Sequence, residues 1–114
     1  MGKIKVIGAS VPVICLREED YIVAYCPPLD LSSYGKTEDE AKKAFEEAFD
    51  IFIEETTRKG SLEKVLIKLG WILSKVNYEP PTYSEAELHK LYGARRPLNI
   101  TTKHVRLPSV TAVV

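Results

Sequence analysis

The chain has 114 residues, of which 45% are hydrophobic and 28% are charged. This is enough apolar material for one self-sufficient core, and the chain is too short for two. Its first residues, MGKIKVIG, lack the apolar run of a signal peptide, and no stretch reaches the length of a membrane-spanning helix. We therefore expect one globular domain located in the cytoplasm.

The net charge of zero hides an asymmetry along the chain. Residues 1–87 hold all 16 acidic residues and 11 basic ones, a net charge of −5, whereas residues 88–114 hold five basic residues and no acid. Such a basic tail can contact nucleic acid, or it can lie against an acidic surface of its own or a neighbouring subunit. The sequence leaves both possibilities open.

Two β-prone runs near the N-terminus favour an antiparallel hairpin. Residues 3–16 and Tyr21–Cys26 flank four polar residues, 17–20, that are typical of a tight turn. Side chains alternate along strands, so one face of the hairpin is small and apolar and the other is unusually aromatic. The first face comprises Val11, Val13, Cys15, Ile22, Ala24 and Cys26, and the second Pro12, Ile14, Leu16, Tyr21, Val23 and Tyr25. The second face needs a cover, from the tail, a second copy or another protein.

The two cysteines are expected to be buried thiols. A turn centred on residues 18–19 places Cys15 opposite Ile22, which leaves Cys26 too far away for a disulfide. The chain's two histidines lack the paired spacing of a structural zinc site. We expect no disulfide, metal or cofactor.

A long amphipathic helix is predicted after a proline-rich turn and a short strand. Thr37 and Glu40 have the spacing of a capping box, and Gly60 is placed to end the helix. The helix has one apolar stripe, formed by Ala41, Ala44, Phe45, Ala48, Phe49 and Phe52. The expected fold is therefore α+β, with this helix packed on one face of a three-stranded antiparallel sheet.

Smaller elements are predicted after Gly60. Ser61 is placed to cap a short second helix over residues 62–69, and residues 71–78 have the composition of a strand. A second capping-box pattern at Ser84 predicts a helix that ends at Gly93.

The last segment, residues 94–114, is basic and β-prone, and we expect it to form an extended arm that pairs with a sheet, preferably that of a second subunit. We divide the chain into an α+β core, residues 1–78, and a basic C-terminal extension, residues 79–114. The extension belongs to the same domain or to an oligomer interface.

Several short motifs resemble those of the HicB-like antitoxin family in their order and spacing. The resemblance covers residues 1–72, where GSLEKVLIKLGW is similar to the family's usual continuation. The matching residues are Tyr21, Cys26-Pro27, Leu29-Asp30, Gly35, Thr37 and Glu40-Ala41. Leu31 and Tyr34 stand where small or polar residues are more common in the family.

The resemblance implies a partial ribonuclease-H-like fold and a function in binding. Members commonly bind and block a small HicA-type toxin that cleaves mRNA, and many carry a helix-turn-helix or ribbon-helix-helix segment for DNA. No such segment is recognisable after the core of this chain. We therefore expect a non-catalytic antitoxin, or a binding protein derived from one, that forms at least a dimer.

Two alternatives remain open at this point. The chain could be a nucleic-acid-binding regulator that acts through its basic tail, or an oligomeric protein without a toxin partner. Binding to DNA or RNA through the tail would depend steeply on salt, because each phosphate contact releases counterions.

Enzymatic activity is not expected from these residues. A ribonuclease-H-type nuclease needs carboxylates that converge on metal ions, beginning with one inside the first strand, and residues 3–16 contain no acid. Asp20, Asp30 and Glu40 are better explained by a turn, a loop and a helix cap.

Five residues are the candidates for contact with a partner. Tyr21, Tyr25 and Tyr34 are expected to provide apolar contact, and Arg95 and Arg96 to act as polar anchors.

Overall fold

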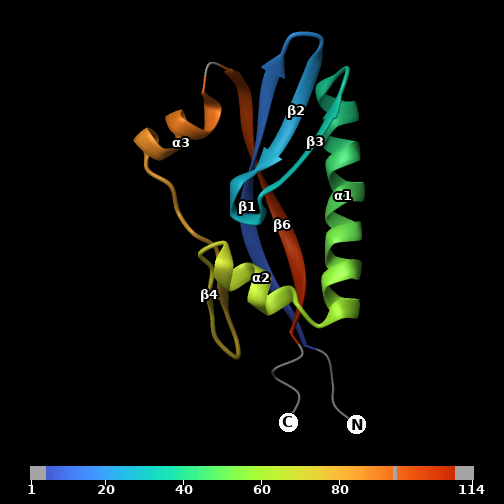
Figure 1. Ribbon diagram of the computed structural model, residues 1–114, viewed down its shortest axis with the longest axis vertical. Coiled ribbons are helices and arrows are strands. Elements are labelled where there is room, and N and C mark those ends of the chain that lie inside the picture. The colour runs from blue at the N-terminus through green and yellow to red at the C-terminus, as the bar shows by residue number, and fades with distance from the viewer. Residues whose placement is uncertain (1–4, 94, 110–114) are drawn as a thin grey trace.

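The computed structural model describes residues 5–93 and 95–109, without the side chains of Lys5 and Arg96. This part of the chain forms strands, helices and a short 3₁₀ helix, and ends in one long C-terminal strand (Figure 1). In chain order the elements are β1 (Lys5–Glu18), β2 (Tyr21–Cys26), η1 (Pro27–Leu29), β3 (Leu31–Gly35), α1 (Glu38–Lys59), α2 (Leu62–Lys68), β4 (Ile72–Leu73), β5 (Tyr78–Glu79), α3 (Glu85–Tyr92) and β6 (Arg96–Ser109).

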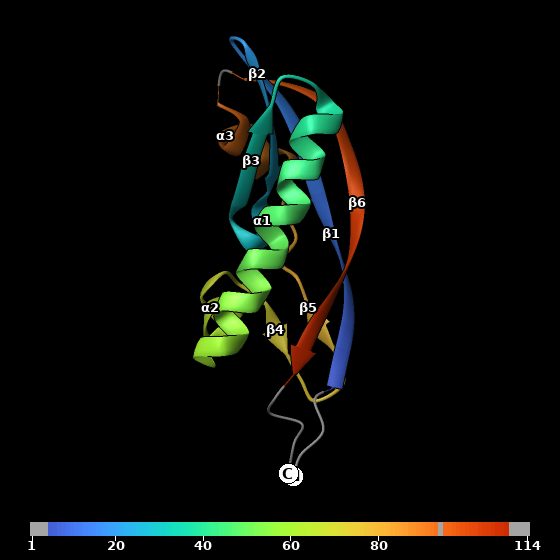
Figure 2. The ribbon, with the colours of Figure 1, turned by 90° about the vertical axis from the view of Figure 1, so that its right-hand side faces the viewer.

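The main sheet has four strands in the order β3-β2-β1-β6, and every neighbouring pair is antiparallel. Helix α1 lies across one face of this sheet (Figure 2), while α3 lies on the other side of the molecule (Figure 1). The predicted α+β class, with one long helix on an antiparallel sheet and a short second helix, is confirmed. The sheet gains its fourth strand from the C-terminal segment.

The β1–β2 hairpin has a tighter turn than the sequence predicted. Glu18 pairs with Tyr21, so the turn consists of Glu19 and Asp20 alone, and Cys15 lies opposite Ala24. The register therefore differs from the predicted one by two residues. A shift of two keeps every side chain on its own face of the sheet, because the side-chain period of a strand is two.

The face under α1 holds the main core. It contains all six predicted residues of the first hairpin face together with Ala41, Phe45 and Phe49 of α1. Val105 and Leu107 of β6 are buried in the same cluster. Cys15 and Cys26 are free thiols within it.

The second, aromatic face is covered in part by α3. Ile14 and Leu16 are fully buried and pack with Tyr92 of α3, and Val23 and Leu88 border this second cluster. The cover predicted for this face thus comes from the helix of the C-terminal extension.

The long helix α1 begins and ends as predicted, with one difference in its cap. The Oγ1 atom of Thr37 accepts a hydrogen bond from the backbone N–H of Glu40 (3.1 Å), and Gly60 ends the helix with a φ of 67°. The carboxylate of Glu40 does not bond back to Thr37. It accepts from the backbone N–H of Lys36 at 2.8 Å, which ties the end of β3 to the first turn of α1.

The prediction of one strand over residues 71–78 is wrong. Ile72–Leu73 and Tyr78–Glu79 are two short strands of a separate hairpin, whose turn is closed by hydrogen bonds between Ser74 and Asn77. Trp71, which precedes this hairpin, is buried and donates its indole N–H to the carbonyl of Pro28 (2.7 Å). Ser61 precedes α2 as predicted, but its side chain makes no capping hydrogen bond.

The C-terminal arm pairs within its own chain. Strand β6 runs antiparallel to β1 from Arg96 opposite Arg17 to Ser109 opposite Lys5, with one bulge near Cys15. The expectation that this segment adds to a second subunit's sheet is therefore wrong for residues 96–109, and residues 110–114 lie outside the described part. No helix in the described ranges is long and apolar enough to cross a bilayer.

Candidate functional site

Two exposed tyrosines lie together near the β1–β2 turn. Tyr21 and Tyr34 expose 48% and 67% of their surface, and their ring centroids are 5.5 Å apart in an edge-to-face arrangement. Strand pairing explains this proximity, because Val23 lies opposite Tyr34 and Tyr21 is two residues away on the same sheet face. The structure therefore brings together two of the three predicted tyrosines.

The tyrosine pair borders a hollow of about 250 Å³ on the sheet face opposite α1. We call this surface the tyrosine face; it consists of Glu18, Tyr21, Val23 and Tyr34. Aromatic rings of this kind, half exposed and held on a sheet, are the side chains that most often dominate the energetics of protein interfaces.

Arg95 lies beside the tyrosine face, and its guanidinium is already engaged in hydrogen bonds within the chain. Its guanidinium donates to Glu18 (3.1 Å) and to the backbone carbonyls of Leu91 and Tyr92 (2.9 and 3.1 Å). These bonds fix the C-terminal end of α3 to the β1–β2 turn, so Arg95 positions Glu18 at the rim of the face. The side chain of Arg96 is outside the described part of the structure.

Tyr25 occupies the opposite end of β2 and does not join the pair. Its hydroxyl donates to Asp30 (3.3 Å), and burial together with the nearby Asp30 carboxylate raises the pKa of Tyr25. Asp30 itself has a φ of 49° and ends the 3₁₀ helix η1. The hydrogen bond of Tyr25 therefore stabilises the turn between β2 and β3.

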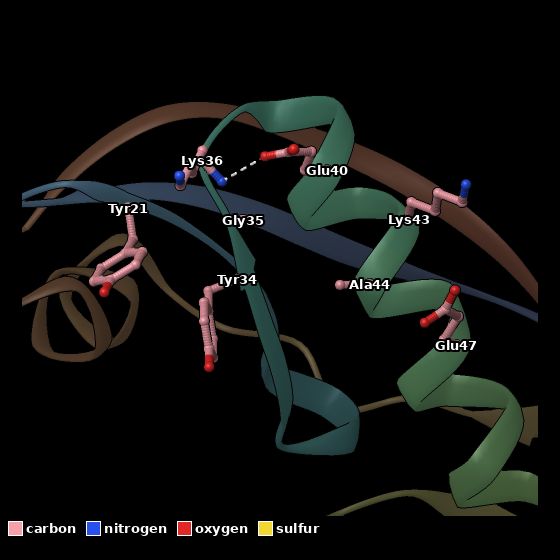
Figure 3. Close-up of a pocket in the computed structure, with 8 residues that line it drawn as sticks. All are labelled: Tyr21, Tyr34, Gly35, Lys36, Glu40, Lys43, Ala44 and Glu47. Atoms are coloured by element: carbon pink, nitrogen blue, oxygen red, sulfur yellow. Dashed lines mark hydrogen bonds between the residues drawn. The ribbon is translucent and has the colours of Figure 1, made fainter.

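A second and larger hollow, of about 480 Å³, lies along the outer edge of β3 (Figure 3). Figure 3 shows Tyr21 and Tyr34 on one side of β3 and the side chains of α1 on the other. We call this hollow the β3-edge groove; it is lined by Tyr21, Tyr34, Gly35, Lys36, Glu40, Lys43, Ala44 and Glu47.

Sequence analysis missed most of the β3-edge groove. Ala44 belongs to the predicted apolar stripe, and Glu40, Lys43 and Glu47 recur at helical spacing beside it, which is the signal that could have found them. Only the assignment of β3 as an edge strand shows that this flank of α1 borders an open side of the sheet.

The carboxylates and thiols of the core have structural explanations. Asp30 accepts from Tyr25 and Glu40 from the Lys36 backbone, and the described residues contain no cluster of three His, Cys, Asp or Glu suited to a metal ion. Burial raises the pKa of the Cys15 thiol and raises that of Cys26 to about 12. At neutral pH both thiols are therefore protonated and weakly nucleophilic.

The basic tail is partly neutralised by the chain's own acids. Arg95 pairs with Glu18, and Lys103 pairs with Glu46 at 3.3 Å while lying 5.5 Å from the centre of the Phe49 ring. His104 shares a 2.7 Å hydrogen bond with Ser10. These contacts favour a tail that lies against the acidic body over one held free for nucleic acid.

Comparison of the chain with protein-family models, curated proteins and solved structures finds no match. The assignment of function thus depends on the geometry of the two hollows and on the residues they contain.

Proposed function

We propose that this chain is a non-catalytic HicB-like antitoxin that binds and blocks a small HicA-type toxin through its tyrosine face. The main support is the exposed Tyr21–Tyr34 pair. Two adjacent, largely exposed aromatic rings on a rigid sheet form the kind of anchor around which protein interfaces are built, and they are unfavourable to leave in water without a partner.

The charge of the body suits the proposed partner. A toxin that cleaves mRNA must attract a polyanion and is therefore expected to be basic. Glu18 lies at the rim of the tyrosine face, and the exposed acids Glu19 and Asp20 form the adjacent β1–β2 turn. Opposite charges of this kind speed the encounter of two proteins and orient them before the apolar contact forms.

A mutation of Tyr21 tests this proposal. The experiment uses the small basic protein encoded by a neighbouring reading frame, whose cleavage of RNA is measured with increasing amounts of this chain. Tyr21→Ala should weaken inhibition about thirtyfold, which corresponds to about 2 kcal/mol for an interface anchor.

Ile72→Ala is the matched control, because Ile72 is 68% exposed but belongs to the separate β4–β5 hairpin. It should inhibit like the unmodified chain. Failure of the unmodified chain to bind the neighbouring protein, or equal inhibition by the two variants, would overturn the proposal.

A further inference from the structure

The sheet has two open edges, and they differ in how well they are protected. Strand β6 is 14 residues long and has proline near each end, at Pro97 and Pro108. Its exposed positions include the basic residue Arg106, and two antiparallel copies of β6 would bring like charges close together. Proline and lysine or arginine at an edge are the usual means of preventing strand addition.

Strand β3 has none of these protective features. Its sequence, LSSYG, contains no charge and no proline, and it is the terminal strand of the sheet. The β3-edge groove lies along this edge, with the tyrosines on one side and α1 on the other (Figure 3). The backbone of an added strand would therefore find both hydrogen-bonding partners and a flanking hollow.

We propose that the β3 edge pairs antiparallel with the β3 edge of a second copy of this chain. A two-fold axis perpendicular to the sheet produces this arrangement and joins the two four-stranded sheets into one of eight strands. Rotation about this axis leaves each face of the sheet on its own side, so both α1 helices lie on one face and both tyrosine faces on the other.

The charges of the groove favour a second copy as the occupant. Lys36, which lies between β3 and α1, and Glu40, Lys43 and Glu47 of α1 alternate in sign along the groove. A two-fold interface presents the same patch twice, so a patch of alternating sign can match itself when the helices run antiparallel. Glu40 and Ala41 lie beside Gly35, the last residue of β3. A two-fold axis near Gly35 therefore makes Glu40 meet Lys43 of the second copy and Lys36 meet Glu47 of the second copy.

The same charges disfavour a basic partner at this edge. The groove has as many lysines as glutamates, so it offers no net negative charge to a basic protein. Ala44 also lines the groove, and its small side chain leaves room for a second helix.

Light scattering and sedimentation of the purified chain over a range of concentrations test the proposal. The unmodified chain should reach twice the 12.8 kDa mass of one copy. Glu47→Lys should raise the dimer dissociation constant roughly tenfold, because the substituted side chain of each copy then meets Lys36 of the other as a like charge. Glu47 is exposed, so circular dichroism should show an unchanged fold.

The double variant Lys36→Glu, Glu47→Lys reverses both charges and should restore the dissociation constant to within about threefold of the unmodified chain. Glu54→Lys is the control, since it makes the same change of charge on an exposed position of α1 outside the groove, and it should leave the dissociation constant unchanged.

The inference would be overturned if the chain stays monomeric at protein concentrations up to about 1 mM, which is the dissociation constant of a very weak complex. A dimer whose dissociation constant is unchanged by Glu47→Lys would also overturn it, because the interface would then lie at another surface. The same holds if Glu47→Lys weakens the dimer and the double variant does not restore it. The measurement needs no toxin, so its result is independent of the proposed antitoxin function.

Discussion

Gly35 shows how one small residue sets the distance between β3 and α1. A Cβ atom at this position would lie 2.6 Å from the backbone nitrogen of Ala41 and 2.6 Å from the Cβ of Glu40. Real Cβ atoms do not approach other atoms so closely, and the nearest neighbour is helix backbone that has little freedom to move. The groove between β3 and the first turns of α1 thus depends on the absence of a side chain here.

Gly35→Ala is expected to lower the free energy of unfolding by ~1–3 kcal/mol, the usual cost of overpacking. Gly8→Ala is the matched control, because Gly8 also lies in a strand and a Cβ there meets nothing within 4 Å. Its effect should stay within about 0.5 kcal/mol. Urea denaturation measures both, and equal midpoints for the two variants would contradict the close approach of β3 and α1.

Among the elements, α3 has the most complete local signal in the chain. The Oγ atom of Ser84 accepts from the backbone N–H of Glu87 (3.2 Å), and the Glu87 carboxylate accepts from the backbone N–H of Ser84 (3.0 Å). This hydrogen bond lowers the pKa of Glu87. Its stabilising contribution is therefore present at neutral pH and is lost as the pH falls through that lowered pKa.

Ser84→Ala should destabilise α3 by about 1 kcal/mol, the typical cost of losing an N-cap. Hydrogen exchange of the α3 amides should then speed up about fivefold at neutral pH. Ser61→Ala serves as the control, because Ser61 precedes α2 without a capping hydrogen bond. Faster exchange in α2 on Ser61→Ala, matching the effect in α3, would show that the caps do not differ.

The elements also show where local patterns mislead. Residues 71–78 have the composition of one strand, but the indole of Trp71 is buried against the carbonyl of Pro28, 43 residues earlier in the chain. The hydroxyl of Tyr78 then contacts Glu63 of α2 at 3.3 Å. These two long-range contacts hold the ends of the segment, and the chain reverses between them. No local pattern contains that information.

For the whole molecule, the pairing of β6 with β1 is the decisive feature. Leu107 is fully buried in the main core although it lies close to the end of the chain. Leu107→Ala should cost about 2–5 kcal/mol in unfolding free energy, as for other large-to-small changes in cores.

Ile100→Ala provides the comparison within the same strand, because Ile100 is 54% exposed, and it should cost little. Thermal and urea unfolding distinguish the two variants. A small effect of Leu107→Ala, similar to that of Ile100→Ala, would mean that β6 is not part of the core in solution.

Sequence by itself determined the features that depend on neighbouring residues. Side-chain chemistry and side-chain period act over a few residues, and several features follow from them. These are the strand at Tyr21–Cys26, the start of α1 at Thr37, its end at Gly60, the capping box at Ser84 and the two faces of the hairpin. The face assignment survived a two-residue error in register for the same reason.

Tertiary structure alone decided the features that depend on distant parts of the chain. The order β3-β2-β1-β6 makes β3 an open edge, lays the C-terminal strand on β1 of its own chain and brings α3 over Ile14 and Leu16. It also places Tyr34 of β3 beside Tyr21 of β2 and the polar side of α1 along the same edge. The physical reason is that the β-prone sequence of β6 can pair either with β1 of its own chain or with a strand of another subunit. Which pairing forms depends on the reach of the chain and on the total apolar surface that is buried, and no local pattern expresses either quantity.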